Sequence, residues 1–231
     1  MVGDLRASSG GGNVQYVNVR DDDGDQSASH TINGHSLILR VRHGNVHILL
    51  GGDLNRHGAE RLLKFVSLAN PPIALQSEVL KVPHHGSHDY SSDFLSAVAP
   101  IVTIVSSGDE NPSKEYVHPR ANLMAALGKH SRSDEPLLFS TELAAFFTYR
   151  GGVQPEQHRK TSAGNLVDLG ATSQRGFFFA FDRLRFGAIR LRTDGERVFV
   201  APESASDLIK EAYAFRILGD GSVTKDPVRI V

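Results

Sequence analysis

Three short polar clusters stand where an apolar segment gives way to a predicted helix, and their side chains could bind a metal ion. The clusters are Gly51-Gly52-Asp53, His84-His85-Gly86-Ser87 and His118-Pro119. Ligands of α/β sheets bind at the carboxyl ends of the strands, so all three clusters are expected at one sheet edge. One carboxylate with two or three imidazoles is a ligand set that suits zinc. The sequence therefore predicts a metal site shared by the three clusters.

Each cluster also has a purely structural explanation. Asp53 stands before a predicted helix and could simply cap it. A His pair in a chain with 11 His is often a surface feature, and His118 could merely begin a turn before Pro119. The order and spacing of the three clusters, rather than any one of them, favour a functional site.

Composition limits the kinds of protein that this chain can be. It has 231 residues, 40% of them hydrophobic, which is enough for one large domain or two small ones. It has no Cys, which excludes disulfides and thiolate metal sites. The formal net charge of −1 gives no bulk attraction to nucleic acid or to an anionic membrane. No apolar run is long enough to span a bilayer, and the N-terminus lacks a signal-peptide core, so a cytoplasmic location is expected if Met1 is the true start.

Apolar periodicity and turn residues predict an α/β arrangement between residues 36 and 139. Strands are expected at 36–41, 46–50, 79–82, 101–105 and 137–139, and helices at 55–69, from Ser91 or Ser92 to Pro100, and at 119–127 with Gly128 as the C-terminal cap. The strands at 36–41 and 46–50 form a hairpin. Each polar cluster then follows a strand or precedes a helix.

The segments on either side of this core have weaker patterns. Residues 1–35 read as a flexible or partial N-terminal segment with one strand at 14–19, and residues 150–176 as a polar insertion. A strand is predicted at 177–181, a hairpin at 186–200 around a two-residue Asp194-Gly195 turn, and a short helix at 206–214. Arg190 and Arg192 alternate onto one face of that hairpin, either as a solvated edge or as phosphate contacts.

Four motifs in this order resemble the ComEC/Rec2-like branch of the metallo-β-lactamase superfamily. That branch typically reads N-x-x-S-L-V-L, L-L-x-G-D, L-K-V-x-H-H-G-S and H-P. The matching segments, which together cover about residues 33–145, are Asn33–Arg40, Ile48–Asp53, Leu80–Ser87 and His118-Pro119. The H-H-G-S block after its strand is the most specific of the four.

The resemblance implies a fold, a reaction and a role for each site residue. The fold is a four-layer αββα sandwich, of which residues 36–231 would be the C-terminal half. The reaction is hydrolysis with two zinc or manganese ions, on a phosphodiester, with DNA as the suggested substrate. Asp53 matches the aspartate that bridges the metals, and His84 matches the last ligand histidine, with His85 as the alternative ligand. His118 matches an active-site position that contacts substrate or leaving group.

The sequence departs from the superfamily in one respect. The first metal motif, H-x-[HD]-x-D-H, is not found, although His30 or His35 could stand in for one ligand. We therefore expect a fragment of a longer protein, a subunit completed by a second chain, or a degenerate domain kept for binding. A non-catalytic α/β module that binds a partner is the alternative function. A missing half of the sandwich also predicts an exposed apolar sheet face, with candidates Leu37, Leu39, Leu49, Val79 and Ile101.

Overall fold

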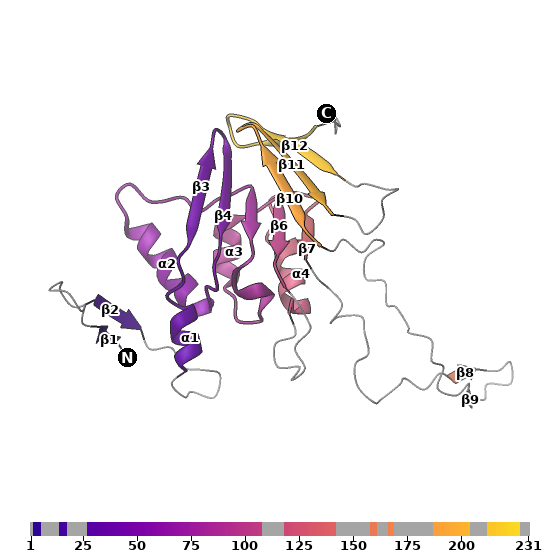
Figure 1. The fold of residues 1–231 in the computed structure, drawn as a ribbon, viewed down its shortest axis with the longest axis horizontal. Coiled ribbons are helices and arrows are strands. Elements are labelled where there is room, and N and C mark those ends of the chain that lie inside the picture. Colours follow the sequence, from indigo (N-terminus) through magenta and orange to yellow (C-terminus); the bar gives the residue numbers. More distant parts are fainter. Residues whose placement is uncertain are drawn as a thin grey trace.

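The computed structural model describes residues 2–5, 14–17, 27–107, 118–141, 158–160, 166–168, 187–203 and 212–226. Its centre is a five-stranded sheet in the order β3-β4-β5-β6-β7 (Figure 1). The strands are β3 Leu39–His43, β4 Val46–Leu50, β5 Val79–Lys81, β6 Val102–Val105 and β7 Leu137–Ser140. β3 and β4 form an antiparallel hairpin, and β4 to β7 run parallel. The carboxyl ends of the four parallel strands therefore lie at the same edge.

Three helices cover one face of this sheet: α2 Arg56–Leu68, α3 Ser92–Val98 and α4 Ala121–Lys129. Asn55 caps α2 by accepting the Gly58 N–H at 3.0 Å, and Ser91 caps α3 by accepting the Phe94 N–H at 3.2 Å. Such caps satisfy backbone donors that have no partner inside a helix. The predicted starts of α2 and α3 are therefore confirmed.

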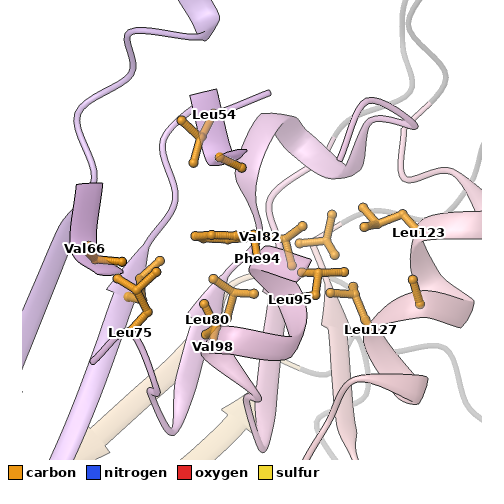
Figure 2. Packing of buried hydrophobic residues seen from close by; sticks show 14 residues of the cluster. Leu54, Val66, Leu75, Leu80, Val82, Phe94, Leu95, Val98, Leu123 and Leu127 are labelled. Atoms are coloured by element: carbon orange, nitrogen blue, oxygen red, sulfur yellow. The ribbon is translucent and has the colours of Figure 1, made fainter. Parts of the chain in front are cut away.

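A dry core fills the space between the helices and the sheet, as Figure 2 shows. Phe94 and Leu95 of α3 point into it beside Leu80, and Leu123 and Leu127 enter from α4. All five side chains are 2% exposed or less. Burying a large apolar side chain fully contributes about 1.5–3 kcal/mol. This core fixes the helices whose N-terminal ends border the polar clusters.

A second, antiparallel sheet packs against the opposite face, so the chain forms three layers (Figure 1). Its strands, in order, are β10 Ile189–Thr193, β11 Arg197–Pro202, β12 Tyr213–Ile217 and β13 Val223–Lys225. Val198, Val200, Phe215 and Ile217 of this sheet join a second core that includes Val79 and Val102. The α/β class is confirmed by this arrangement.

Several short elements lie outside these layers. A six-residue helix, α1 Ala28–Asn33, precedes β3, and a 3-10 turn, η1 Pro83–Gly86, follows β5. β1 Val2–Leu5 pairs with β2 Val14–Val17, and β8 His158–Lys160 pairs with β9 Leu166–Asp168. β2 matches the predicted strand at 14–19, whereas β1 and α1 fall in a segment that the sequence predicted to be flexible. No helix in the described ranges is long and apolar enough to cross a membrane.

The prediction of an exposed apolar sheet face is half right. Leu37 and Leu39 are 85% and 51% exposed, as expected. Leu49, Val79 and Ile101 were wrong candidates, because they are 0%, 1% and 3% exposed. Leu49 faces the helices, and the other two lie under the C-terminal strands of the same chain. The chain thus covers most of its central sheet by itself.

Three local predictions were also wrong. α4 begins at Ala121 rather than Pro119, and Gly128 lies inside it, with His130 as the C-terminal cap. Tyr213 and Ala214 belong to β12 instead of the predicted helix at 206–214. Residues 206–211 of that helix lie outside the described residues, so they are not tested, and the same holds for the predicted strand at 177–181. The hairpin register pairs Thr193 with Val198, which leaves a loop longer than two residues.

The polar residues of the β10–β11 hairpin form hydrogen bonds with one another. Asp194 accepts the backbone N–H groups of Glu196 and Arg197 at 3.0 and 2.7 Å, which shapes the longer loop. Arg190 and Arg192 are exposed on one face, as expected, and Arg190 donates to Glu203 at 3.0 Å. Phosphate contact by this face remains a prediction.

Replacement of Phe215 by Ala should test the packing of the second sheet. Phe215 is 5% exposed in the inter-sheet core, so the variant should lose about 3–5 kcal/mol of unfolding free energy in urea. Thr224→Ala on the neighbouring β13 is exposed and should stay within about 0.5 kcal/mol of the unchanged protein. Equal, small losses in both variants would contradict the packing of the two sheets.

Candidate functional site

The carboxyl ends of β4 and β5 deliver two of the polar clusters side by side. The Gly51 N–H donates to the Lys81 carbonyl at 3.1 Å, and the His84 N–H donates to the Gly52 carbonyl at 3.0 Å. These bonds continue the strand pairing past the end of the sheet. They fix the backbone around Asp53 against the backbone around the His pair.

The His pair has an unusual backbone conformation. His84 and His85 have φ values of 49° and 51°, in the left-handed region that residues with a Cβ adopt rarely. Each such residue costs on the order of 1–3 kcal/mol, and residues of this kind cluster at functional sites. Two in succession turn both imidazoles to the sheet edge.

His85, rather than His84, is the histidine in contact with Asp53. Its Nδ1 lies 2.7 Å from the Ser106 carbonyl, which can only accept, so Nδ1 carries a proton. Its Nε2 lies 3.3 Å from Asp53 Oδ1, and both side chains are about half exposed. In neutral His85 the Nε2 lone pair faces a carboxylate oxygen, an arrangement that a second proton or a cation between the two atoms stabilises.

This spacing fits a metal ion. Two ligands at about 2.0–2.1 Å from a tetrahedral ion lie roughly 3.3–3.4 Å apart. Asp53 and His85 could therefore hold one ion together, which favours the alternative ligand over His84. Among the residues that the structure describes, no group of three His, Asp or Glu side chains is arranged to hold a metal. The donors present fit part of a metal site.

His84 points to other partners. The Asn33 amide donates to its Nε2 at 3.1 Å, and its Nδ1 is buried without a hydrogen-bond partner in the described structure. Its ring lies 6.1 Å from that of His118. Burial lowers the pKa of His84, and the charges of Asp53 and Asp89 oppose that effect in part.

His118 is held neutral at the same edge. Burial lowers its pKa to about 4, assisted first by the positive charge of Arg120. Structure thus places all four predicted residues together, in two contacting pairs: Asp53 with His85, and His84 with His118.

Gly86 fixes the His118-Pro119 cluster against the loop that carries the His pair. Its carbonyl accepts the Arg120 N–H at 2.8 Å, and its φ is 86°. A Cβ at this position would lie 2.7 Å from the Pro119 Cβ, closer than side chains tolerate. The glycine of H-H-G-S is therefore required by the approach of His118-Pro119, as well as by its own backbone conformation.

Sequence reasoning assigned no role to three residues that contact the site. Asn33 donates to His84, Ser36 Oγ accepts the Asp53 N–H at 3.1 Å, and Arg120 lies beside His118. Asn33 and Ser36 belong to the N-x-x-S motif, so the resemblance held the only signal for them.

His30 and His35, which the sequence offered as substitute metal ligands, have contacts other than Asp53. His30 Nε2 lies 3.8 Å from Asp89 Oδ2, and His35 Nδ1 lies 2.7 Å from the Thr31 carbonyl of α1. His30 thus contacts Asp89 instead of Asp53, and the Nδ1 of His35 is directed at the α1 backbone.

Three curated proteins are similar to this chain. It is 35% identical over 132 residues to Competence protein ComA of Neisseria gonorrhoeae, 30% over 100 residues to ComE operon protein 3 of Bacillus subtilis, and 30% over 116 residues to Recombination protein 2 of Haemophilus influenzae. These matches cover 55%, 43% and 50% of this chain but 17%, 12% and 13% of the relatives. No protein-family model and no solved structure matches the chain. The similarities support a relation to ComEC-like proteins, and the metallo-β-lactamase fold stays a prediction.

The low pKa of His118 predicts a dependence of stability on pH. An unfolded His protonates near pH 6.5, whereas folded His118 protonates at about 4. The resulting stability is complete above the unfolded pKa and is lost as the pH falls from about 6.5 to 4. His118→Gln should flatten the unfolding free energy over this range, measured in urea.

The exposed His43 provides a matched control for this experiment. His43→Gln should keep the pH dependence of the unchanged protein. If His118→Gln also keeps it, His118 is not the group that resists protonation.

Proposed function

We propose that this chain contributes the C-terminal part of a ComEC-like, metal-dependent hydrolase domain of the metallo-β-lactamase fold, acting on a phosphodiester of a nucleic acid. The contact of His85 with Asp53 carries the proposal. Nδ1 of His85 is committed as a donor to Ser106, and Nε2 faces the Asp53 carboxylate at 3.3 Å. A metal-ligating His commonly donates its other ring N–H to a carbonyl in this way.

The surroundings of this pair support a site that binds cations. His84 and His118 lie next to it, and burial lowers the pKa of both, so their rings are neutral near pH 7. His85 presents its Nε2 lone pair to the site and Asp53 adds a negative charge, whereas Nε2 of His84 accepts the Asn33 amide in this structure. Asp53 with His85 or His84 would hold the ion, zinc or manganese by the family resemblance.

The bound ion would supply a water molecule with a lowered pKa and stabilise developing negative charge. The residues of this chain do the rest: Ser36 holds the backbone at Asp53, and Asn33 orients His84. Neutral His118 carries one ring N–H, which can donate a hydrogen bond to an anionic oxygen. Nucleic acid is the proposed substrate class because relatives are named for competence and recombination.

The described residues supply too few ligands for a complete site, since zinc sites normally have three or four. In this proposal the remaining ligands come from another polypeptide segment or from a second chain. A metal held by two residues alone would bind weakly.

One observation favours a second function, a non-catalytic α/β module that binds a partner. The 3.3 Å contact between Asp53 and His85 is also what an ordinary ion pair with protonated His85 gives. In that case the edge is a polar binding surface, and metal adds nothing to it. Metal binding separates the two functions.

Zinc titration of the 231-residue chain should show weak binding with less than one ion per chain. Asp53→Ala and His85→Ala should each weaken it further, by about tenfold or more, because each removes one of very few ligands. Replacement of the exposed His43 by Ala is the matched control and should leave zinc binding unchanged. Equal zinc binding in all four proteins would favour the non-catalytic module.

Hydrolysis of a labelled single-stranded oligonucleotide provides the second measurement. With zinc or manganese added, this chain should show no activity above background, because the site lacks ligands. A longer protein that also carries an H-x-[HD]-x-D-H segment should hydrolyse it, and Asp53→Ala should then abolish turnover. Two tightly bound metals and robust turnover in the 231-residue chain would overturn this account of the site.

A further inference from the structure

Arg120 brings a positive charge to the site edge, directly after His118-Pro119. It is the N-cap residue of α4, yet its side chain makes no capping hydrogen bond. The backbone does the anchoring, because the Arg120 N–H donates to the Gly86 carbonyl at 2.8 Å. The residue is therefore fixed in place while its guanidinium remains available.

No acidic group neutralises this charge in the part of the chain that the structure describes. The salt bridges of the described residues involve Arg132, Arg190, Arg197 and Arg216, but not Arg120. Its Nε is buried and has no hydrogen-bond partner. A buried N–H of a charged group normally finds an acceptor, and the described residues supply none for the Nε of Arg120.

The position of Arg120 links it to the other site residues. It follows His118-Pro119 directly, and Pro119 packs against Gly86 of the H-H-G-S loop. Arg120 is close enough to His118 for its charge to be the strongest charge effect on that ring. Across His118 lies His84, at 6.1 Å between ring centroids. Arg120, His118 and His84 therefore belong to one neighbourhood at this sheet edge.

We propose that Arg120 is a substrate-binding residue whose guanidinium, beside His118, binds a phosphate oxygen of a phosphodiester. This inference rests on the proposed function, because it names the residue that recognises the anionic group of the substrate. A guanidinium is planar and presents parallel N–H donors, a geometry that matches two oxygens of one phosphate. Asp53 and His85 then hold the cation, and Arg120 holds the anion.

The test is binding of a fluorescent oligothymidylate to the full chain, in chelator and at low salt, read by anisotropy. Chelator removes any metal, so binding is measured apart from hydrolysis. Arg120→Gln should bind roughly tenfold more weakly, because a hydrogen bond to a charged group is lost. The slope of log affinity against log salt should fall by about 0.7, the value for one phosphate contact on a single strand.

Two variants serve as controls. Lys129→Gln removes a charge at the opposite, exposed end of α4 and should bind like the unchanged protein. Arg120→Lys keeps the charge but loses the paired donors, so its affinity should be intermediate. Affinity that drops equally in Lys129→Gln and Arg120→Gln would reduce the effect to net charge and overturn the inference.

Inorganic phosphate provides a measurement that needs no Gln variant. Titration of phosphate into the unchanged protein should shift the Nε–H resonance of Arg120, which Arg120→Lys identifies by its disappearance. An unshifted resonance, or unchanged oligothymidylate binding in Arg120→Gln, overturns the inference. Neither result decides the proposed function, which depends on zinc binding and hydrolysis through Asp53 and His85.

Discussion

The parallel alignment of β4, β5 and β6 is the constraint on which the rest of the structure depends. Ile48, Val79 and Val102 are paired across these strands, so the strands end nearly level. Parallel sheets need cover on both faces, and the chain supplies it with helices on one side and β10–β13 on the other. Because the strands end together, the loops that follow them must meet, whatever residues they carry.

The two edges of this sheet differ in how their buried polar groups are paired. At the amino end of β5, Glu78 is 3% exposed and accepts hydrogen bonds from the His47 backbone and from Arg132. Arg132 also donates to the Ala99 carbonyl at 2.9 Å, so this buried carboxylate joins β4, β5 and the end of α3. At the carboxyl end, left-handed histidines and a buried Nδ1 of His84 without a hydrogen bond persist instead. The amino edge thus carries a paired buried carboxylate, whereas the carboxyl edge carries the strained backbone.

Local signals were sufficient for the elements that surround the site. Caps at Asn55 and Ser91 and apolar strands before Asp53 and His84 are read directly from neighbouring residues. The sequence could not choose between His84 and His85, because left-handed backbone redirects both rings independently of any periodicity. α1 was missed for a related reason: its contacts, such as the Asn55 amide on the His30 carbonyl at 2.7 Å, are long-range. β12 was missed because pairing with β11, rather than intrinsic propensity, decides its conformation.

The charges of the site are separated in a way that suits its proposed substrate. Asp53 contacts His85, Arg120 lies beside His118, and the His84 ring is 6.1 Å from the His118 ring. In the proposed arrangement, a metal ion at Asp53 and a phosphate at Arg120 would both lie near His84 and His118, which burial keeps neutral. Charged imidazoles would repel the ion, and a carboxylate beside Arg120 would compete with the phosphate. The low pKa of His118 is a consequence of its burial, and the neutral ring that results is compatible with a cation bound nearby.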